Sequence, residues 1–140
     1  MSAGTGVTHS ELNASQNEQV HFLQIGVLPE TIGLDPGYEQ KNPSLNDRRN
    51  RLCLRASPDG HDGSVTVRQD IRIDASMLDN GHKVTHLLVP ARKAYTQPAS
   101  GTAEMNGHLL YAGDGAPITE EPFIVLAGMP EAEVLVFDIA

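Results

Sequence analysis

The chain has 140 residues, a formal net charge of -8 at pH 7 and a sequence pI near 5.1. This length predicts an ordinary globular size with a core of its own. Nucleic-acid affinity rests on clustered Lys and Arg side chains that release counterions from phosphates, so direct binding of nucleic acid is not expected of so acidic a chain.

Cysteine content and hydropathy set two further expectations. Cys53 is the only cysteine, which excludes a disulfide within the chain. No basic-then-apolar stretch that is typical of a signal peptide, and no membrane span, stands out along the sequence. These features predict a cytoplasmic protein without a membrane partner.

The first motif along the chain is GTGVTHSELN at residues 4–13, which carries His9 and Glu11. On an extended strand both side chains would point to one face, with Cα atoms roughly 6.5 to 7 Å apart. An imidazole nitrogen with a carboxylate oxygen suits Fe(II), Mn(II), Ni(II) or Zn(II). Because useful affinity needs three or four protein ligands, the pair alone is either half a metal site or a partly exposed strand end.

Short apolar runs bounded by turn residues are typical of β-strands, and they recur along the chain. The predicted strands lie in VHFLQIGVLP (20–29), SVTVRQDIRI (64–73), KVTHLLVP (83–90), HLLYAG (108–113), FIVLAG (123–128) and EVLVFDI (133–139). The separators contain Asn-Gly and Asp-Gly, which suit hairpin turns because both residue types tolerate positive φ. No segment has a convincing helical stripe. The pattern predicts an all-β sandwich or barrel with antiparallel strands.

The stretch TIGLDPGYEQKNPSLNDRRNR at 31–51 has no hydrophobic period and contains two prolines, which indicates a connector. Half of the basic residues of the chain fall within it or just beyond it, namely Lys41, Arg48, Arg49, Arg51 and Arg55. Two interpretations stay open: a solvated linker, or a site for an anion or an acidic partner.

Other candidate groups are weaker. His82 and His86 have the spacing of a metal pair on a helix, but the surrounding sequence favours a strand, where they would lie roughly 13 Å apart. Cys53 between Arg51 and Arg55 is either a thiol of lowered pKa or a small apolar side chain. There is no nucleophile elbow and no phosphate-binding loop.

Several stretches together resemble the bacterial pirin-like proteins, which are two-domain cupins. They are MSAGTGVTHSELN, VHFLQIGVLP, GTAEMNGHLLYAGDG and AEVLVFDI, and they occur in the order of that family. In the family the first cupin binds iron through a His-x-His pair and a later His-Ser-Glu segment. The resemblance implies that His9 and Glu11 are the later pair. Some members show quercetin 2,3-dioxygenase activity, whereas the second cupin generally carries no metal.

The resemblance also implies a division of the chain. Met1 matches a methionine inside the family pattern, so we expect residues 1–30 to be the closing strands of a truncated first cupin. Residues 31–50 would be a linker and residues 51–140 a metal-free second cupin, a double-stranded β-helix or jelly-roll barrel. The ligand positions of that second domain would fall near Leu87 and Val89 and near Leu126 and Gly128, none of which binds metal. Pro98 departs from the usual strand and suits only an edge or a bulge.

Three functions compete on these grounds. The first is a non-catalytic binding or regulatory module that takes a protein partner or a small aromatic ligand and needs no cofactor in isolation. The second is a quercetin 2,3-dioxygenase with Fe(II) or another divalent metal, which requires another chain to complete the site of His9 and Glu11. The third is a truncated or mis-started product without a dedicated function. We favour the binding module and expect a homo-oligomer, because an unpaired apolar strand edge invites another chain.

Overall fold

The structure is a computed structural model that describes residues 1–140. Its strands are β1 (Cys53–Ser57), β2 (Val65–Thr66), β3 (Ile71–Leu78), β4 (Lys83–Leu87), β5 (Lys93–Met105), β6 (His108–Tyr111), β7 (Ala116–Ile118) and β8 (Phe123–Ile139). The helical elements are α1 (Leu45–Arg48) and a short turn, η1 (His61–Gly63). The predicted all-β class is therefore confirmed. No helix has the length or the apolar character needed to cross a membrane.

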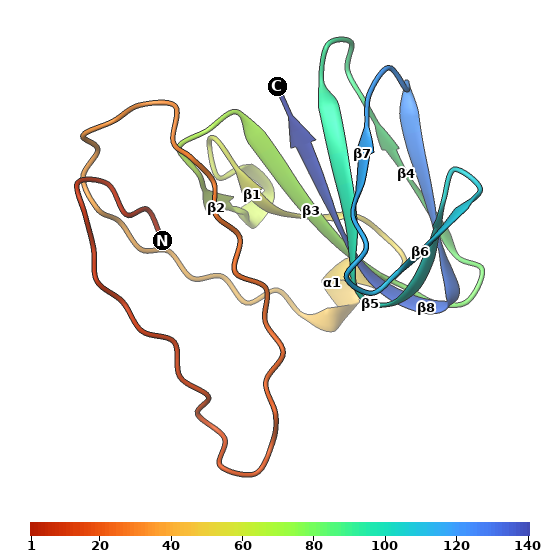
Figure 1. The fold of residues 1–140 in the computed structure, drawn as a ribbon, viewed down its shortest axis with the longest axis horizontal. Helices are drawn as coiled ribbons and strands as arrows, with labels where there is room; N and C mark the ends of the chain where they lie inside the picture. The colour runs from red at the N-terminus through yellow and green to blue at the C-terminus, as the bar shows by residue number, and fades with distance from the viewer.

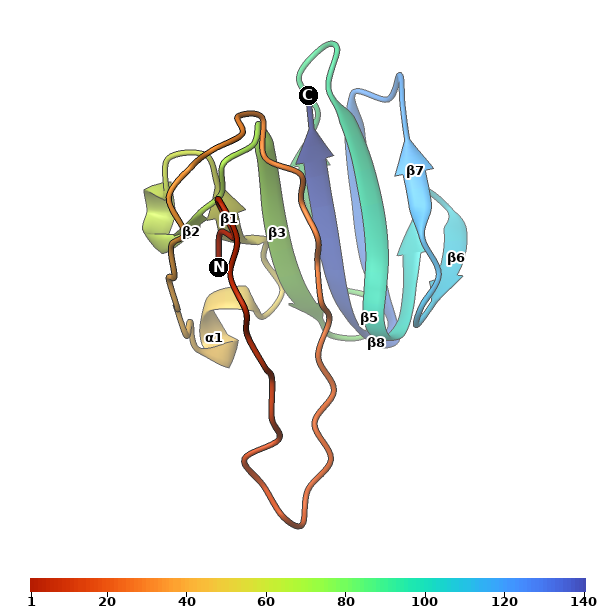
Figure 2. The same ribbon diagram turned by 60° about the vertical axis from the view of Figure 1, so that its left-hand side comes forward.

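All eight strands join one sheet, whose main path runs β2-β1-β3-β8-β5-β6, while β4 pairs with β8 and β7 pairs with β5 (Figure 1). Every pairing is antiparallel except that of β1 with β2. The long strand β8 organises the sheet, because its first part pairs with β4 and its last part with β3. The sheet curls around one face without closing into a complete barrel (Figure 2).

The two faces of the sheet carry different cores. Directly paired residues share a face, so the side of Val134 and Val136 is called the inner face, and the side of Leu135 and Phe137 the outer face. The larger cluster fills the inner face and includes Leu78, Val84, Ala94, Ile118, Ile124, Leu126, Val134 and Val136. A smaller cluster on the outer face contains Ala56, Ile71, Ile73 and Phe137.

Strand β5 stays paired to β8 despite Pro98 because the register shifts beside it. One irregularity lies between Pro98 and Ser100 and another between Gly101 and Ala103. Of the two situations expected for Pro98, an edge or a bulge, the structure has a bulge directly after it. Gly101 has φ +72°, and a Cβ atom there would lie 2.0 Å from the carbonyl oxygen of Glu131, so only glycine permits this close approach of the two strands.

Residues 1–44 contain no helix and no strand. They form a long loop that reaches beyond the sheet, and Ser2 and Gly37 join its ends with N–H···O distances of 2.8 and 3.0 Å (Figures 1 and 2). The strand predicted for VHFLQIGVLP is therefore not formed in this structure. A strand needs a neighbour to pair with, and residues 20–29 have none.

The predicted linker is partly structured. Ser44 caps α1, where its N–H and its hydroxyl both bond to the carboxylate of Asp47. Beyond the helix, Asn50 donates its N–H to the carbonyl of Met77 at 2.7 Å and its amide to Asp79 at 2.8 Å. The chain is thus attached to the end of β3 before the first strand begins.

Candidate functional site

His9 and Glu11, the predicted half of a metal site, lie in the N-terminal loop with exposed side chains. Neither makes a hydrogen bond or an ion pair through its side chain, and no group of three or more His, Cys, Asp or Glu residues is placed to hold a metal ion. A divalent transition metal needs three or four protein ligands, so the donor set of one chain does not fit such an ion.

The resemblance would place the metal ligands of a second cupin near Leu87, Val89, Leu126 and Gly128, whose side chains offer no metal-binding atom. Leu87 and Val89 are exposed at the end of β4, whereas Leu126 and Gly128 are buried in β8. His86 lies within β4, so the strand predicted for this stretch is confirmed. Its imidazole contacts the carboxylate of Asp138 and does not pair with His82.

A buried carboxylate on the inner face gathers the polar groups of three segments. Asp138 in β8 lies 2.9 Å from Nε2 of His86, and it also accepts a bond from the Arg92 guanidinium. Arg92 reaches Asp70 at 2.9 Å as well. Burial raises the pKa of the nearby Asp74, and the Asp138 carboxylate acts in the same direction while His86 opposes it. No sequence motif indicated this cluster, because its members lie far apart in the chain.

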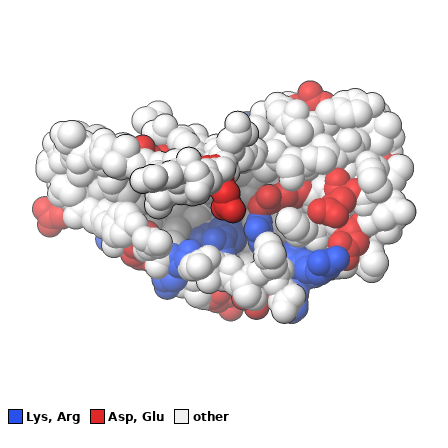
Figure 3. Space-filling view, turned by 90° about the horizontal axis from the view of Figure 1, so that it is seen from below, with Lys and Arg blue, Asp and Glu red and all other residues white.

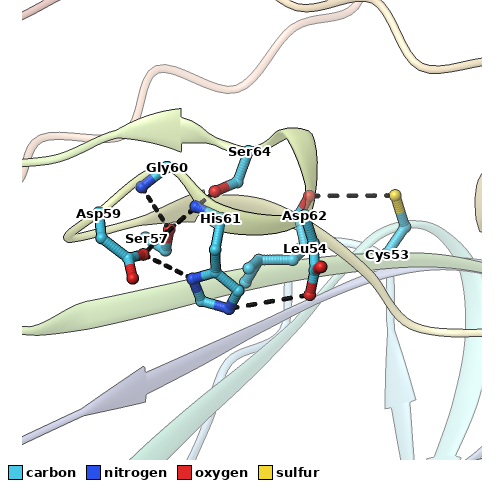
Figure 4. A network of polar contacts seen from close by, with 8 residues as sticks. All are labelled: Cys53, Leu54, Ser57, Asp59, Gly60, His61, Asp62 and Ser64. Carbon is cyan, nitrogen blue, oxygen red and sulfur yellow. Dashed lines mark hydrogen bonds and ion pairs between the residues drawn. The ribbon is translucent and has the colours of Figure 1, made fainter.

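A second polar network closes the turn between β1 and β2 (Figure 4). The buried Ser57 hydroxyl accepts a bond from the N–H of Gly60 at 3.0 Å and lies 2.7 Å from the hydroxyl of Ser64. Nδ1 of His61 lies 2.5 Å from Oδ1 of Asp59. This hydrogen bond lowers the pKa of Asp59 from 3.8 to about 2. The Ser57 hydroxyl also donates to the same carboxylate oxygen of Asp59 at 3.1 Å, so the four side chains together fix the shape of the turn.

A large cavity lies between the N-terminal loop and the outer face of the sheet. Its volume of about 760 Å³ is within the usual range of small-molecule sites. Its floor includes Ala56, Ile73 and Leu135, and its roof includes Ile25 and Val27. The loop therefore covers part of the sheet without forming a strand on it, and Val27 is its contact with the outer cluster.

Three arginines line this cavity, and only one of them has a partner. Arg48 pairs with Glu133, whereas the side chains of Arg55 and Arg68 make no ion pair or hydrogen bond. Figure 3 shows basic side chains gathered along one margin of a hollow in the surface. The cavity thus has excess positive charge, although the chain as a whole has a net charge of -8.

The basic residues that the sequence places together between Lys41 and Arg55 have different surroundings in the structure. Arg49 pairs with Asp79 at 2.8 Å, and Arg51 donates to the carbonyl of Asn46 at 2.7 Å. Arg48 and Arg49 thus hold the connector against the sheet through Glu133 and Asp79, whereas the bond of Arg51 lies within the connector. Arg55 alone of the five points to a ligand, because it is half-buried, unpaired and lines the cavity.

Comparison with known proteins supports the same architecture. The family described as "Quercetinase C-terminal cupin domain" matches residues 54–139. The crystal structure of YhhW from Escherichia coli aligns with a TM-score of 0.76 at 30% identity, over 81% of this chain and 47% of that one. The bacterial pirin YhhW in complex with nickel(II) aligns with a TM-score of 0.73 at 31% identity, over 79% of this chain and 47% of that chain.

A curated relative gives the relation in length. The protein named quercetin 2,3-dioxygenase from Escherichia coli K12 is 36% identical over 139 residues, which cover 99% of this chain and 59% of that protein. The chain therefore spans less than two thirds of the length of this relative.

Proposed function

Because the chain belongs to the pirin-like family of quercetinase C-terminal cupin domains, we propose that it acts as a non-catalytic binding or regulatory module. The single observation that carries this proposal is the cavity of about 760 Å³ on the outer face, which has an apolar floor and unpaired arginines. A site of this volume and lining suits a small aromatic or otherwise apolar ligand.

The donor set of a single chain is too small to support a metal-dependent step. Two ligands leave at least about four positions of an octahedral ion to water, so the ion would be weakly held and would exchange freely. His9 and Glu11 are also exposed, so the surrounding chain would not keep water from a bound substrate.

The test is oxygen uptake with quercetin, measured on the chain with stoichiometric Fe(II). The matched variant carries His9→Ala and Glu11→Ala, which lie outside every strand and leave the sheet untouched. We expect both proteins to show the rate of free iron. Uptake well above that rate, lost in the variant, contradicts the non-catalytic role.

The alternative is a quercetin 2,3-dioxygenase-type oxidoreductase whose metal site is completed by another chain. The Escherichia coli relative named quercetin 2,3-dioxygenase and the nickel complex of YhhW favour it. So does the exposure of His9 and Glu11, which leaves both side chains accessible to ligands from a second chain. In that case the activity per chain rises with protein concentration, because the complete site forms only on association.

We also propose a compartment and partners for this module. We place the role in the cytoplasm, where the free thiol of Cys53 suits a reducing compartment. The partners would be further copies of this chain, a protein or a small molecule, with no direct role for nucleic acid because the surface is mostly acidic.

A further inference from the structure

We infer that the cavity on the outer face binds an organic anion, an apolar body with one carboxylate, which is held by Arg55 and Arg68. This inference rests on the proposed binding function and names its ligand class. The two guanidinium groups line a cavity whose other cation, Arg48, is already neutralised by Glu133. They are therefore the two arginines of the cavity that are free to meet a negative charge.

Strand alternation puts Arg55 on the cavity side of β1, and a β-bulge places Ala56 beside it on the same side. Leu54 is paired with Asp74 on the inner face, and in a regular strand Ala56 would return to that face. The register shifts between Leu54 and Ala56, and Ala56 pairs with Ile73 and packs on the outer face instead. The extra residue at this shift is Arg55, which lines the same cavity as Ala56. Bulges commonly redirect a side chain in this way next to functional sites.

Arg68 is positioned by the loop that forms the roof. The N–H of Glu30 donates to the carbonyl of Arg68 at 2.9 Å, and the side-chain amide of Gln69 donates to the carbonyl of Leu28 at 3.0 Å. Val27 packs against the outer cluster between these ties and the sheet. Arg68 and Gln69 thus attach the roof to the rest of the chain. The guanidinium of Arg68 therefore lies at the margin where roof and floor meet.

The chemistry of the lining selects a carboxylate on an apolar body. A guanidinium presents a planar fork that matches a carboxylate with two parallel hydrogen bonds. About half of the lining residues are hydrophobic, including Ile73, Val65 and Leu135 of the floor. An inorganic anion would leave these side chains without contacts, whereas a neutral apolar molecule would leave the guanidinium groups unpaired.

The test compares 2-naphthoate with 2-naphthamide, which has nearly the same shape and no charge, by titration calorimetry on the full chain. We expect the naphthoate to bind at least about tenfold more tightly, as charge-assisted hydrogen bonds to arginine suggest. Raising the salt concentration should weaken the binding of the naphthoate and leave the affinity for the amide unchanged.

The variants are Arg55→Met and Arg68→Met, with Arg72→Met as the matched control. Arg72 is an exposed arginine of β3 outside the cavity, so its substitution changes the net charge equally. We expect Arg55→Met to lose about tenfold in naphthoate affinity, Arg68→Met to lose less because its side chain is more accessible to water, and Arg72→Met to lose nothing. Circular dichroism verifies the fold of each variant, and Arg68→Met supplies a second test if Arg55→Met does not fold.

The outcomes separate this inference from the binding function. Equal affinity for the naphthoate and the amide, or equal losses in Arg55→Met and Arg72→Met, overturns the anion site and leaves the binding module in place. Binding of neither compound overturns both. Selective binding of the naphthoate that depends on Arg55 supports both.

Discussion

Asp138 lies at the end of β8 with its side chain only 4% exposed, and it meets two partners there. His86 and Arg92 approach it from β4 and from the segment after β4. An unpaired buried carboxylate strongly destabilises the folded state. The same holds for its buried partners when the carboxylate is removed. Asp138 thus links β8 to His86 near the end of β4 and to Arg92 just before β5.

The substitution Asp138→Asn removes the charge while it keeps the size of the side chain. We expect the free energy of unfolding to fall by about 2 to 4 kcal/mol, because Arg92 and His86 lose a buried partner. Urea denaturation followed by circular dichroism measures the change. The control Asp70→Asn removes the other partner of Arg92, which is 53% exposed, and should cost less than about 1 kcal/mol. Equal losses in the two variants would show that burial does not govern this cluster.

Asp59 provides a prediction about pH. Its pKa is lowered from 3.8 to about 2 by the bond with His61, so its stabilising effect is fully present above pH 3.8 and is lost as the pH falls toward 2. The difference in thermal midpoint between the natural chain and Asp59→Asn should therefore shrink over this interval. In His61→Ala, an NMR titration should show the pKa of the Asp59 carboxyl raised from about 2 toward its usual value, because the largest of its stabilising bonds is lost. An unchanged pKa in that variant would refute the role of His61.

At the scale of elements, the sequence predicted the strands that became β2, β3, β4, β6 and β8, and it missed β1, β5 and β7. FIVLAG and EVLVFDI were predicted as two strands but form the single strand β8, because β5 pairs with nearly its whole length across the intervening Met129 and Pro130. SVTVRQDIRI was predicted as one strand but splits into β2 and β3, because β2 pairs parallel to β1 while β3 pairs antiparallel.

The candidate site, too, could be predicted from the sequence only in part. His9 and Glu11 stand out in the sequence because their spacing is local, and Arg55 stands out as one of a basic group. The cavity itself depends on contacts between the N-terminal loop and a sheet some 40 residues later, as the bond between Leu28 and Gln69 shows. No local pattern encodes a contact at that separation, so the sequence could not indicate which arginine faces the cavity.

The boundary after the N-terminal segment leads to a test by deletion. All helices and strands lie between Leu45 and Ile139, and Val27 is the residue of the first 30 that packs against a core cluster. Removal of residues 1–30 should therefore preserve the β signal in circular dichroism and cooperative unfolding, with a loss of about 1 to 2 kcal/mol from the buried part of Val27. The variant Val27→Ser in the full chain should lose a similar amount. A disordered product would contradict the division of the chain at this point.

At the scale of the whole molecule, the apolar side chains of the N-terminal loop are unusually exposed. Phe22 is 57% exposed, Leu28 85% and Ile32 93%. Because exposed apolar side chains promote association, we expect the chain to form a homo-oligomer, and light scattering over a range of concentrations measures this directly. The triple variant Phe22→Ser, Leu28→Ser and Ile32→Ser should shift the protein toward the monomer. A natural chain that stays monomeric throughout the range would refute this expectation.

We propose above all that this cupin module works without a metal of its own, since His9 and Glu11 are two ligands where an ion needs more. The most direct measurement is the iron and nickel content of the chain purified without chelator, determined by mass spectrometry beside the His9→Ala, Glu11→Ala variant. We expect metal far below one ion per chain and equal amounts in both proteins. Stoichiometric metal in the natural chain that disappears in the variant would contradict the proposal.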